Sequence, residues 1–301
     1  MKLRLGVRGM MWLTLVIMMW GIISCRTQEE KCLEEVLSLP LANKEELQKV
    51  LDHYKDDSLK YQAVCFLIRN MPFHAGYEGN ALKHYYQYFD IYAQGKLGPH
   101  EVIDSLKENS FSVSQLKRIE DIANIDSSLL VQNVDWAFKV WREQPWGKNV
   151  SFDNFCEFVL PYRLGDEPLG FWREDIYKRY NPILDSIRLL PQAQDPLVAA
   201  KVLMDSLVVE QSHFTGLFPA GPHLGPSVVS WRAGSCREFA DLVVYVMRAL
   251  GIPCGTDYMA MRGDNNVPHF WNFTLDKDGK TYITEFPDPN WKRAVSMYNP
   301  K

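Results

Sequence analysis

The clearest pattern of apolar and polar positions lies near the C-terminal end of the chain. Between residues 239 and 250, apolar side chains recur every three or four positions, which predicts a helix with one buried face. Ser235 and Glu238 form an S-x-x-E capping box before this run, and Gly251 and Pro253 follow it. Such residues are typical of helix starts and helix ends. These local signals place Cys236 at the first helical position.

Two segments rich in strand-forming residues come next, at 269–275 and 280–286. Asp278-Gly279 between them predicts an antiparallel hairpin. A tight two-residue turn would place Asp288 opposite His269, whereas a three-residue loop would place Glu285 opposite Trp271, on the face that carries His269. A shift of one residue in the strand pairing would move every side chain of the second strand to the other face of the sheet. The sequence pattern therefore leaves both registers open.

The first part of the chain has helical periodicity. Apolar residues three to four apart predict helices at 44–54, 59–70, 82–94, 101–108 and 114–125, which together form a helical domain over 32–135. Residues 136–194 form a helical connecting region rich in aromatic residues and arginine. These side chains either line a cleft or pack helices together, and we favour packing.

The last predicted domain covers 195–301. It begins with a helix at 197–209, which Pro196 starts. Residues 213–230 are rich in glycine, proline and serine, and a loop of this length is usually functional or disordered. Because it directly precedes Cys236, we expect it to form a wall or lid of a cleft.

The N-terminus resembles a targeting segment. Lys2, Arg4 and Arg8 precede an apolar run to Ser24, as in a secretory signal peptide over residues 1–24. Residues 22–25 resemble a bacterial lipobox, which implies cleavage and lipidation at Cys25, followed by a polar tether over 25–31. The alternative is an uncleaved anchor.

Composition narrows the possible partners. The chain has 301 residues, of which 47% are hydrophobic, so it can bury a sizeable core. Cleavage before Cys25 removes three basic residues and no acid, which moves the formal net charge from −4 to −7. This acidic balance argues against nucleic acid as a partner. No sequence motif for a metal, nucleotide or flavin is present, so we expect no cofactor.

The other cysteines have irregular spacings and no C-x-x-C pair, which argues against a zinc site or a disulfide framework. A bridge between Cys32 and Cys65 stays open. Cys254 is expected to lie in the core.

The sequence suggests thiol chemistry around Cys236. Free amides at a helix N-terminus favour an anion, and therefore a thiolate over a thiol. A histidine at a strand start and an acid on the next strand complete the parts of a thiol nucleophile system. Each residue alone would more often be structural, so the ordered combination carries the argument.

The segment Gly234–Pro253, the sequence His269-Phe-Trp-Asn and Tyr282–Glu285 together resemble the bacterial transglutaminase-like superfamily, whose members are papain-like thiol proteins. The resemblance covers about the last 100 residues. It implies an α+β fold, in which a mostly helical N-terminal region precedes a nucleophile helix packed on a small antiparallel sheet. Cys236 matches the family's nucleophile, His269 its base and Glu285 its third position. The family usually has Asp there, which keeps Asp288 as an alternative.

The resemblance implies an amide hydrolase or acyltransferase that acts on peptides or glycopeptides through a Cys236 acyl-enzyme. With the lipobox, it implies a protein anchored by its lipid in the bacterial cell envelope, at the outer membrane, in the periplasm or at the surface. The alternative is an inactive binding module with the same fold. Relatives commonly continue with further strands, so we expect an incomplete sheet edge after residue 289, as in a truncated chain.

Overall fold

The protein has an α+β fold, as predicted. The structure is a computed structural model that describes residues 28–107, 111–263 and 266–293. The predicted signal peptide and the lipidation site at Cys25 lie outside these residues. Helix α2 (Gln28–Leu37) begins within the segment predicted to be a tether. None of the described helices is long and apolar enough to cross a membrane.

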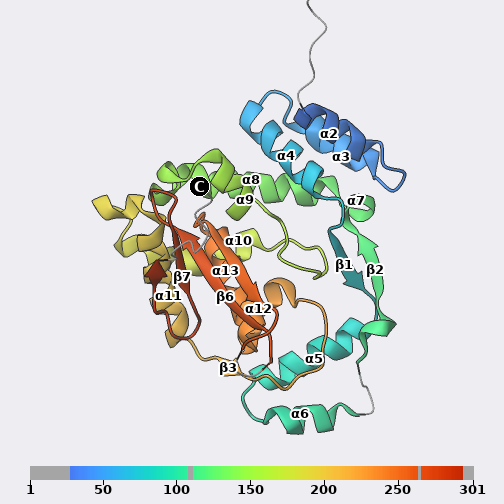
Figure 1. Cartoon of the computed structure of the whole chain (residues 1–301), viewed down its shortest axis with the longest axis vertical. Helices are drawn as coiled ribbons and strands as arrows, with labels where there is room; N and C mark the ends of the chain where they lie inside the picture. Colours follow the sequence, from blue (N-terminus) through green and yellow to red (C-terminus); the bar gives the residue numbers. More distant parts are fainter. Residues whose placement is uncertain (1–27, 108–110, 264–265, 294–301) are drawn as a thin grey trace, which may run out of the picture.

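One hydrophobic core is built from helices at the N-terminal end. Helices α2, α3 (Lys44–His53) and α4 (Ser58–Asn70) pack with α8 (Ser127–Glu143) and α9 (Phe152–Phe158) around it. Figure 1 shows α2, α3 and α4 together at one end of the molecule. The predicted helices at 44–54 and 59–70 are therefore confirmed.

The helix predicted at 114–125 is wrong over most of its length. Strand β2 (Lys117–Glu120) pairs antiparallel with β1 (Ala75–Glu78), and only the short helix α7 (Asp121–Asn124) follows. The Asp121 N–H donates to the His74 carbonyl, and the buried Asp121 carboxylate lies 2.6 Å from Nε of Arg163. These distant partners hold the backbone out of a continuous helix.

A second core surrounds the segment that contains Cys236. It includes α5 (Ala81–Ala93), α10 (Arg173–Tyr180), α11 (Pro196–Val209) and α13 (Cys236–Ala249). The two cores are thus shared among the segments 32–135, 136–194 and 195–301. Within 136–194, Arg163, Glu167 and Arg173 are buried and pack elements together.

Three tyrosines on one face of α5 hold the loop before α13. Their hydroxyls donate to loop carbonyls, Tyr85 to Pro222, Tyr88 to Leu217 and Tyr92 to Phe214. Short helices α6 (Pro99–Ser105) and α12 (Val228–Trp231) flank this region. The short strands β3 (His213–Phe214) and β4 (Ala233–Gly234) pair in parallel, so both ends of the loop are fixed.

Helix α13 packs against the largest sheet of the described residues. This sheet contains β5 (Cys254–Met259), β6 (His269–Leu275), β7 (Thr281–Thr284) and β8 (Lys292–Arg293), all antiparallel and in that order. Helix α13 lies along β6 in Figure 1 and contacts both β5 and β6. A helix that starts with Cys236 therefore lies on a small antiparallel sheet.

Candidate functional site

Cys236 lies at the start of α13, where the predicted capping box is formed. The Ser235 hydroxyl accepts from the Arg237 N–H at 3.3 Å, and the Glu238 carboxylate accepts from the Ser235 N–H at 2.9 Å. At the other end, Gly251 has φ +77°, the left-handed conformation expected after a helix. The Cys236 side chain is half-buried. Since the first amides of a helix have no partner within the helix, they point toward groups that approach this end.

The positive charge of Arg237 is already engaged. Its Nε donates to the buried Glu238 carboxylate at 2.7 Å, and its Nη1 donates to the Gly221 carbonyl at 3.0 Å. This arrangement anchors the loop to the first turn of α13. Any electrostatic support for a Cys236 thiolate must therefore come mainly from the helix N-terminus.

The hairpin register selects one of the two candidate acids. Leu275 pairs with Thr281, and the Asp276 N–H donates to the Lys280 carbonyl, so residues 277–279 form a three-residue loop. In this register, Glu285 continues opposite Trp271.

The side chains of His269 and Glu285 contact each other directly. His269 Nε2 lies 2.9 Å from Glu285 Oε1, with 19% of the His269 side chain and 53% of the Glu285 side chain exposed. Asp288 is exposed, and its carboxylate accepts from the Asn290 amide instead. Of the two acids, Glu285 is the partner of His269.

His269 lies at the end of the sheet nearest Cys236. Strand β5 begins just after the end of α13 and runs back along it, and its last residue, Met259, pairs with His269. Phe286, next to Glu285, stacks on Phe239 of α13 with ring centroids 4.7 Å apart. The end of the sheet that carries His269 and Glu285 thus lies toward the N-terminus of α13.

The pair occupies the sheet face opposite α13. Asn272 donates to the Ala240 carbonyl and Phe286 stacks on α13, so both point toward the helix. Successive strand side chains point to opposite faces, which places His269 and Glu285 on the outer face. Within the described residues, no hydrogen bond joins the Cys236 sulfur to the His269 ring. Two of the three predicted groups, His269 and Glu285, are therefore in contact. The third, Cys236, lies toward the same end of the sheet.

A second histidine–carboxylate pair joins the loop before α13 to the helix itself. His223 Nδ1 is 2.7 Å from Asp241 Oδ2, and both side chains are largely buried. Burial lowers the pKa of His223, but the charge and hydrogen bond of Asp241 raise it by more, to about 9. The imidazole is thus protonated near neutral pH and is not available as a general base. The sequence favours a surface position for His223 over a role in the cleft, although an acid within an apolar helix is a usable signal for this pair.

A groove of about 470 Å³ adjoins this second pair. Its walls come from α13, the edge strand β5, the start of β6 and the end of α9, and its side chains include Phe158, His223, Tyr258, Phe270 and Phe273. Phe270 follows His269, and Tyr258 pairs with Phe270 across the strands. The groove therefore lies between α13 and the edge of the sheet, and its lining combines aromatic side chains with the charged Glu157, Asp241 and Arg248.

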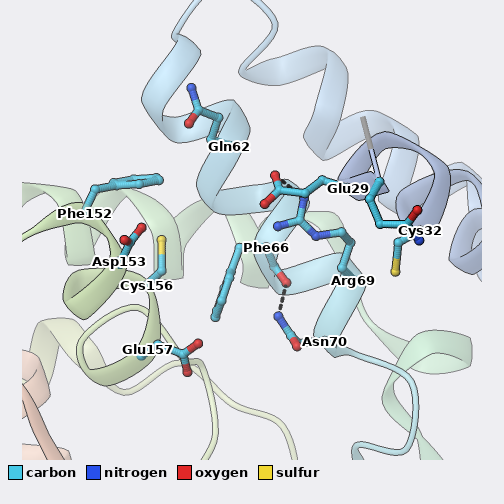
Figure 2. A pocket seen from close by; sticks show the side chains of 11 residues that line it. Glu29, Cys32, Gln62, Phe66, Arg69, Asn70, Phe152, Asp153, Cys156 and Glu157 are labelled. Carbon is cyan, nitrogen blue, oxygen red and sulfur yellow. Dashed lines mark hydrogen bonds and ion pairs between the residues drawn. The ribbon is translucent and has the colours of Figure 1, made fainter. Parts of the chain in front are cut away.

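A larger pocket of about 570 Å³ lies between α2, α4 and α9 (Figure 2). Cys32 and Cys156 line it from opposite sides, and Arg69 pairs with Glu29. Burial raises the pKa of the Cys156 thiol to about 12. No histidine lines this pocket, so it lacks the acid–base group that thiol catalysis needs.

All cysteines within the described residues are free thiols, including Cys32 and Cys65. Cys254 is fully buried, as predicted, and burial raises its pKa to about 12. Burial also raises the pKa of Cys65. Cys236 is thus partly exposed and lies at a helix start, whereas Cys65 and Cys254 are buried.

Comparisons with known protein families, with curated proteins and with solved structures found no match. Among the described residues, there is no group of three or more His, Cys, Asp and Glu side chains that would hold a metal ion. The function is therefore inferred from the geometry of the site.

Proposed function

We propose that the protein is a thiol-dependent amide hydrolase or acyltransferase of the transglutaminase-like type, which acts through a Cys236 acyl-enzyme. The main support is the 2.9 Å contact between His269 and Glu285, at the end of the sheet that lies toward the N-terminus of the helix that Cys236 begins. A carboxylate that holds one imidazole nitrogen fixes the ring and its tautomer. Since Nε2 faces Glu285, Nδ1 is the nitrogen left to exchange a proton with the thiol.

The proposed reaction has two steps. The Cys236 sulfur attacks an amide carbonyl after His269 Nδ1 takes the thiol proton, and this proton then goes to the leaving amine. The C–N bond breaks, and a thioester to Cys236 forms. Water then attacks the thioester carbonyl, the C–S bond breaks, and a carboxylic acid and the free Cys236 thiol are released; an amine in place of water forms a new amide. The Cys236 N–H at the helix start would donate to the developing oxyanion.

The thiol and the imidazole must come together for this reaction. Catalytic hydrogen bonds are often long without substrate and shorten in the reactive complex. Closure would involve the outer rim of the sheet, where His269 is the first residue of β6.

The proposed substrate is a peptide or glycopeptide amide. The groove beside Phe270 offers aromatic walls for a side chain on one side of the scissile bond. Its volume is within the range of small-ligand sites. We further propose that the mature protein is anchored in the bacterial cell envelope by a lipid on Cys25.

Alkylation by iodoacetamide tests the nucleophile. We expect Cys236 to react near neutral pH faster than Cys32, a half-buried thiol on α2 that serves as an internal control. His269→Ala should slow the reaction of Cys236 by roughly tenfold or more, because a positioned base contributes about 100-fold or more in catalysis. Equal, slow reaction at both thiols would instead support the inactive binding module.

The substrate class needs a separate measurement. A thiol-directed peptide probe should add its mass to Cys236, and a series of probes with aromatic, aliphatic and charged side chains would show what the groove accepts. Labelling with palmitate tests the anchor, since Cys25→Ser should abolish it. Labelling that persists in this variant would rule out Cys25 as the lipid site.

A further inference from the structure

Asn272 provides a side-chain link between the strand of His269 and the helix of Cys236. Its Nδ2 donates to the Ala240 carbonyl at 3.0 Å and to the Gly255 carbonyl at 3.3 Å. Only 1% of Asn272 is exposed. Ala240 lies about one helical turn after Cys236, and Asn272 lies three residues after His269. The link therefore joins the two elements close to both candidate catalytic residues.

An asparagine is an unusual choice at this position. Between a helix and a sheet, an apolar side chain would avoid the cost of burying an amide, which is about 1–3 kcal/mol when a hydrogen bond is missing. The cross-strand neighbours Thr256 and Thr284 are also polar, so a polar row crosses three strands under α13. An apolar contact tolerates sliding, whereas a hydrogen bond fixes both distance and direction.

We propose that Asn272 is a positioning residue. Its hydrogen bond holds β6, which carries His269, in register with the first turn of α13, which carries Cys236. This inference rests on the proposed function. It also accounts for the polar residue at a helix–sheet contact, since the bond from Nδ2 to the Ala240 carbonyl sets the spacing between the two elements.

The test is a double-mutant cycle on Cys236 alkylation. Asn272→Leu keeps the approximate size of the side chain and removes the donor. The rate of iodoacetamide reaction at Cys236 is measured from pH 5 to pH 9 in wild type, His269→Ala, Asn272→Leu and the double variant. We expect His269→Ala to slow wild type by roughly tenfold or more, but to slow Asn272→Leu by less than about twofold. The pH profile of Asn272→Leu should then match that of His269→Ala.

Thr274→Val is the matched control. Thr274 lies on the same strand and face, is fully buried, and donates to a backbone carbonyl, that of Pro253 at 2.6 Å. This bond does not involve α13. The Thr274→Val protein should keep the full dependence on His269, because its link to α13 is intact.

The outcomes separate the two hypotheses. If Asn272→Leu retains the full effect of His269→Ala, or if Thr274→Val loses it as well, Asn272 has no specific positioning role, and the proposed function stands. If wild type shows no dependence on His269, both hypotheses fail. Should circular dichroism show that Asn272→Leu is unfolded, Asn272→Thr replaces it, since threonine favours strands and is too short to reach the Ala240 carbonyl.

Discussion

At the scale of single residues, the His223–Asp241 pair shows how burial and charge compete. The Asp241 carboxylate keeps His223 protonated to about pH 9, although the ring is largely buried. The ordinary pKa of histidine is about 6.5. The folded protein therefore holds a proton that the unfolded chain loses at lower pH.

This difference predicts how stability depends on pH. Because the folded pKa is raised, the stabilisation from His223 is complete below about pH 6.5 and is lost as the pH rises through about 9. We expect the free energy of unfolding to fall by roughly 3 kcal/mol over this window, which urea titrations between pH 6 and pH 10 would measure. His223→Gln should remove this part of the slope. An unchanged slope in the variant would mean that another group is responsible.

Two threonines in the sheet predict opposite results for the same substitution. The buried Thr274 hydroxyl donates to the Pro253 carbonyl, whereas the buried Thr284 hydroxyl has no hydrogen-bond partner among the described residues. Thr274→Val should lower the free energy of unfolding by about 1 kcal/mol, and Thr284→Val should leave it unchanged or raise it. Denaturant unfolding of both variants provides the measurement. Equal destabilisation would show that the Thr284 hydroxyl is bonded after all.

At the scale of elements, the ends of α13 are determined by residues close in sequence. The capping box and the glycine that follows the helix were both predictable, because each involves neighbours within a few positions. The two hairpin registers were predictable as alternatives, but the choice depends on the loop bonds around Asp276. Strand β2 was missed since its partner, β1, is distant in sequence.

The cap of α13 should matter for both stability and reactivity. Ser235→Ala removes the acceptor for the Arg237 N–H and should cost about 1 kcal/mol of unfolding free energy. It should also slow alkylation of Cys236, because the first turn frays. Ser151→Ala on α9, where the hydroxyl accepts from the Asn154 N–H, is the matched control. It should destabilise by a similar amount without changing Cys236, and a similar slowing in both variants would contradict a local effect.

At the scale of the whole molecule, one buried guanidinium joins the two cores. Arg173 of α10 donates to the carbonyls of Val159, Leu160 and Pro161 near the first core, and to the Arg248 carbonyl in the second. It also donates to Asn133 of α8. The sequence favours a packing role for the arginines of this region, but every residue has a carbonyl oxygen, so no sequence pattern identifies which carbonyls are their partners.

Arg173 predicts that the two cores unfold together. We expect circular dichroism and tryptophan fluorescence to give coincident unfolding curves. Arg173→Leu leaves several buried carbonyls without their donor and should cost at least about 3 kcal/mol. The exposed Arg142, which lies 3.7 Å from Asp57, is the control, and Arg142→Leu should cost less than about 0.5 kcal/mol. Two separate transitions in wild type would show that the cores are independent.

The three hydroxyl bonds from α5 to the loop at 214–222 have a mechanical consequence. All three donors belong to one rigid helix, so the approach to Cys236 is coupled to the position of α5 as a unit. A ligand that tilts this helix would shift the whole loop at once, while a change at one tyrosine would leave the other two bonds in place. A helix that precedes Cys236 by more than a hundred residues in the chain thereby holds the loop that contacts the first turn of α13.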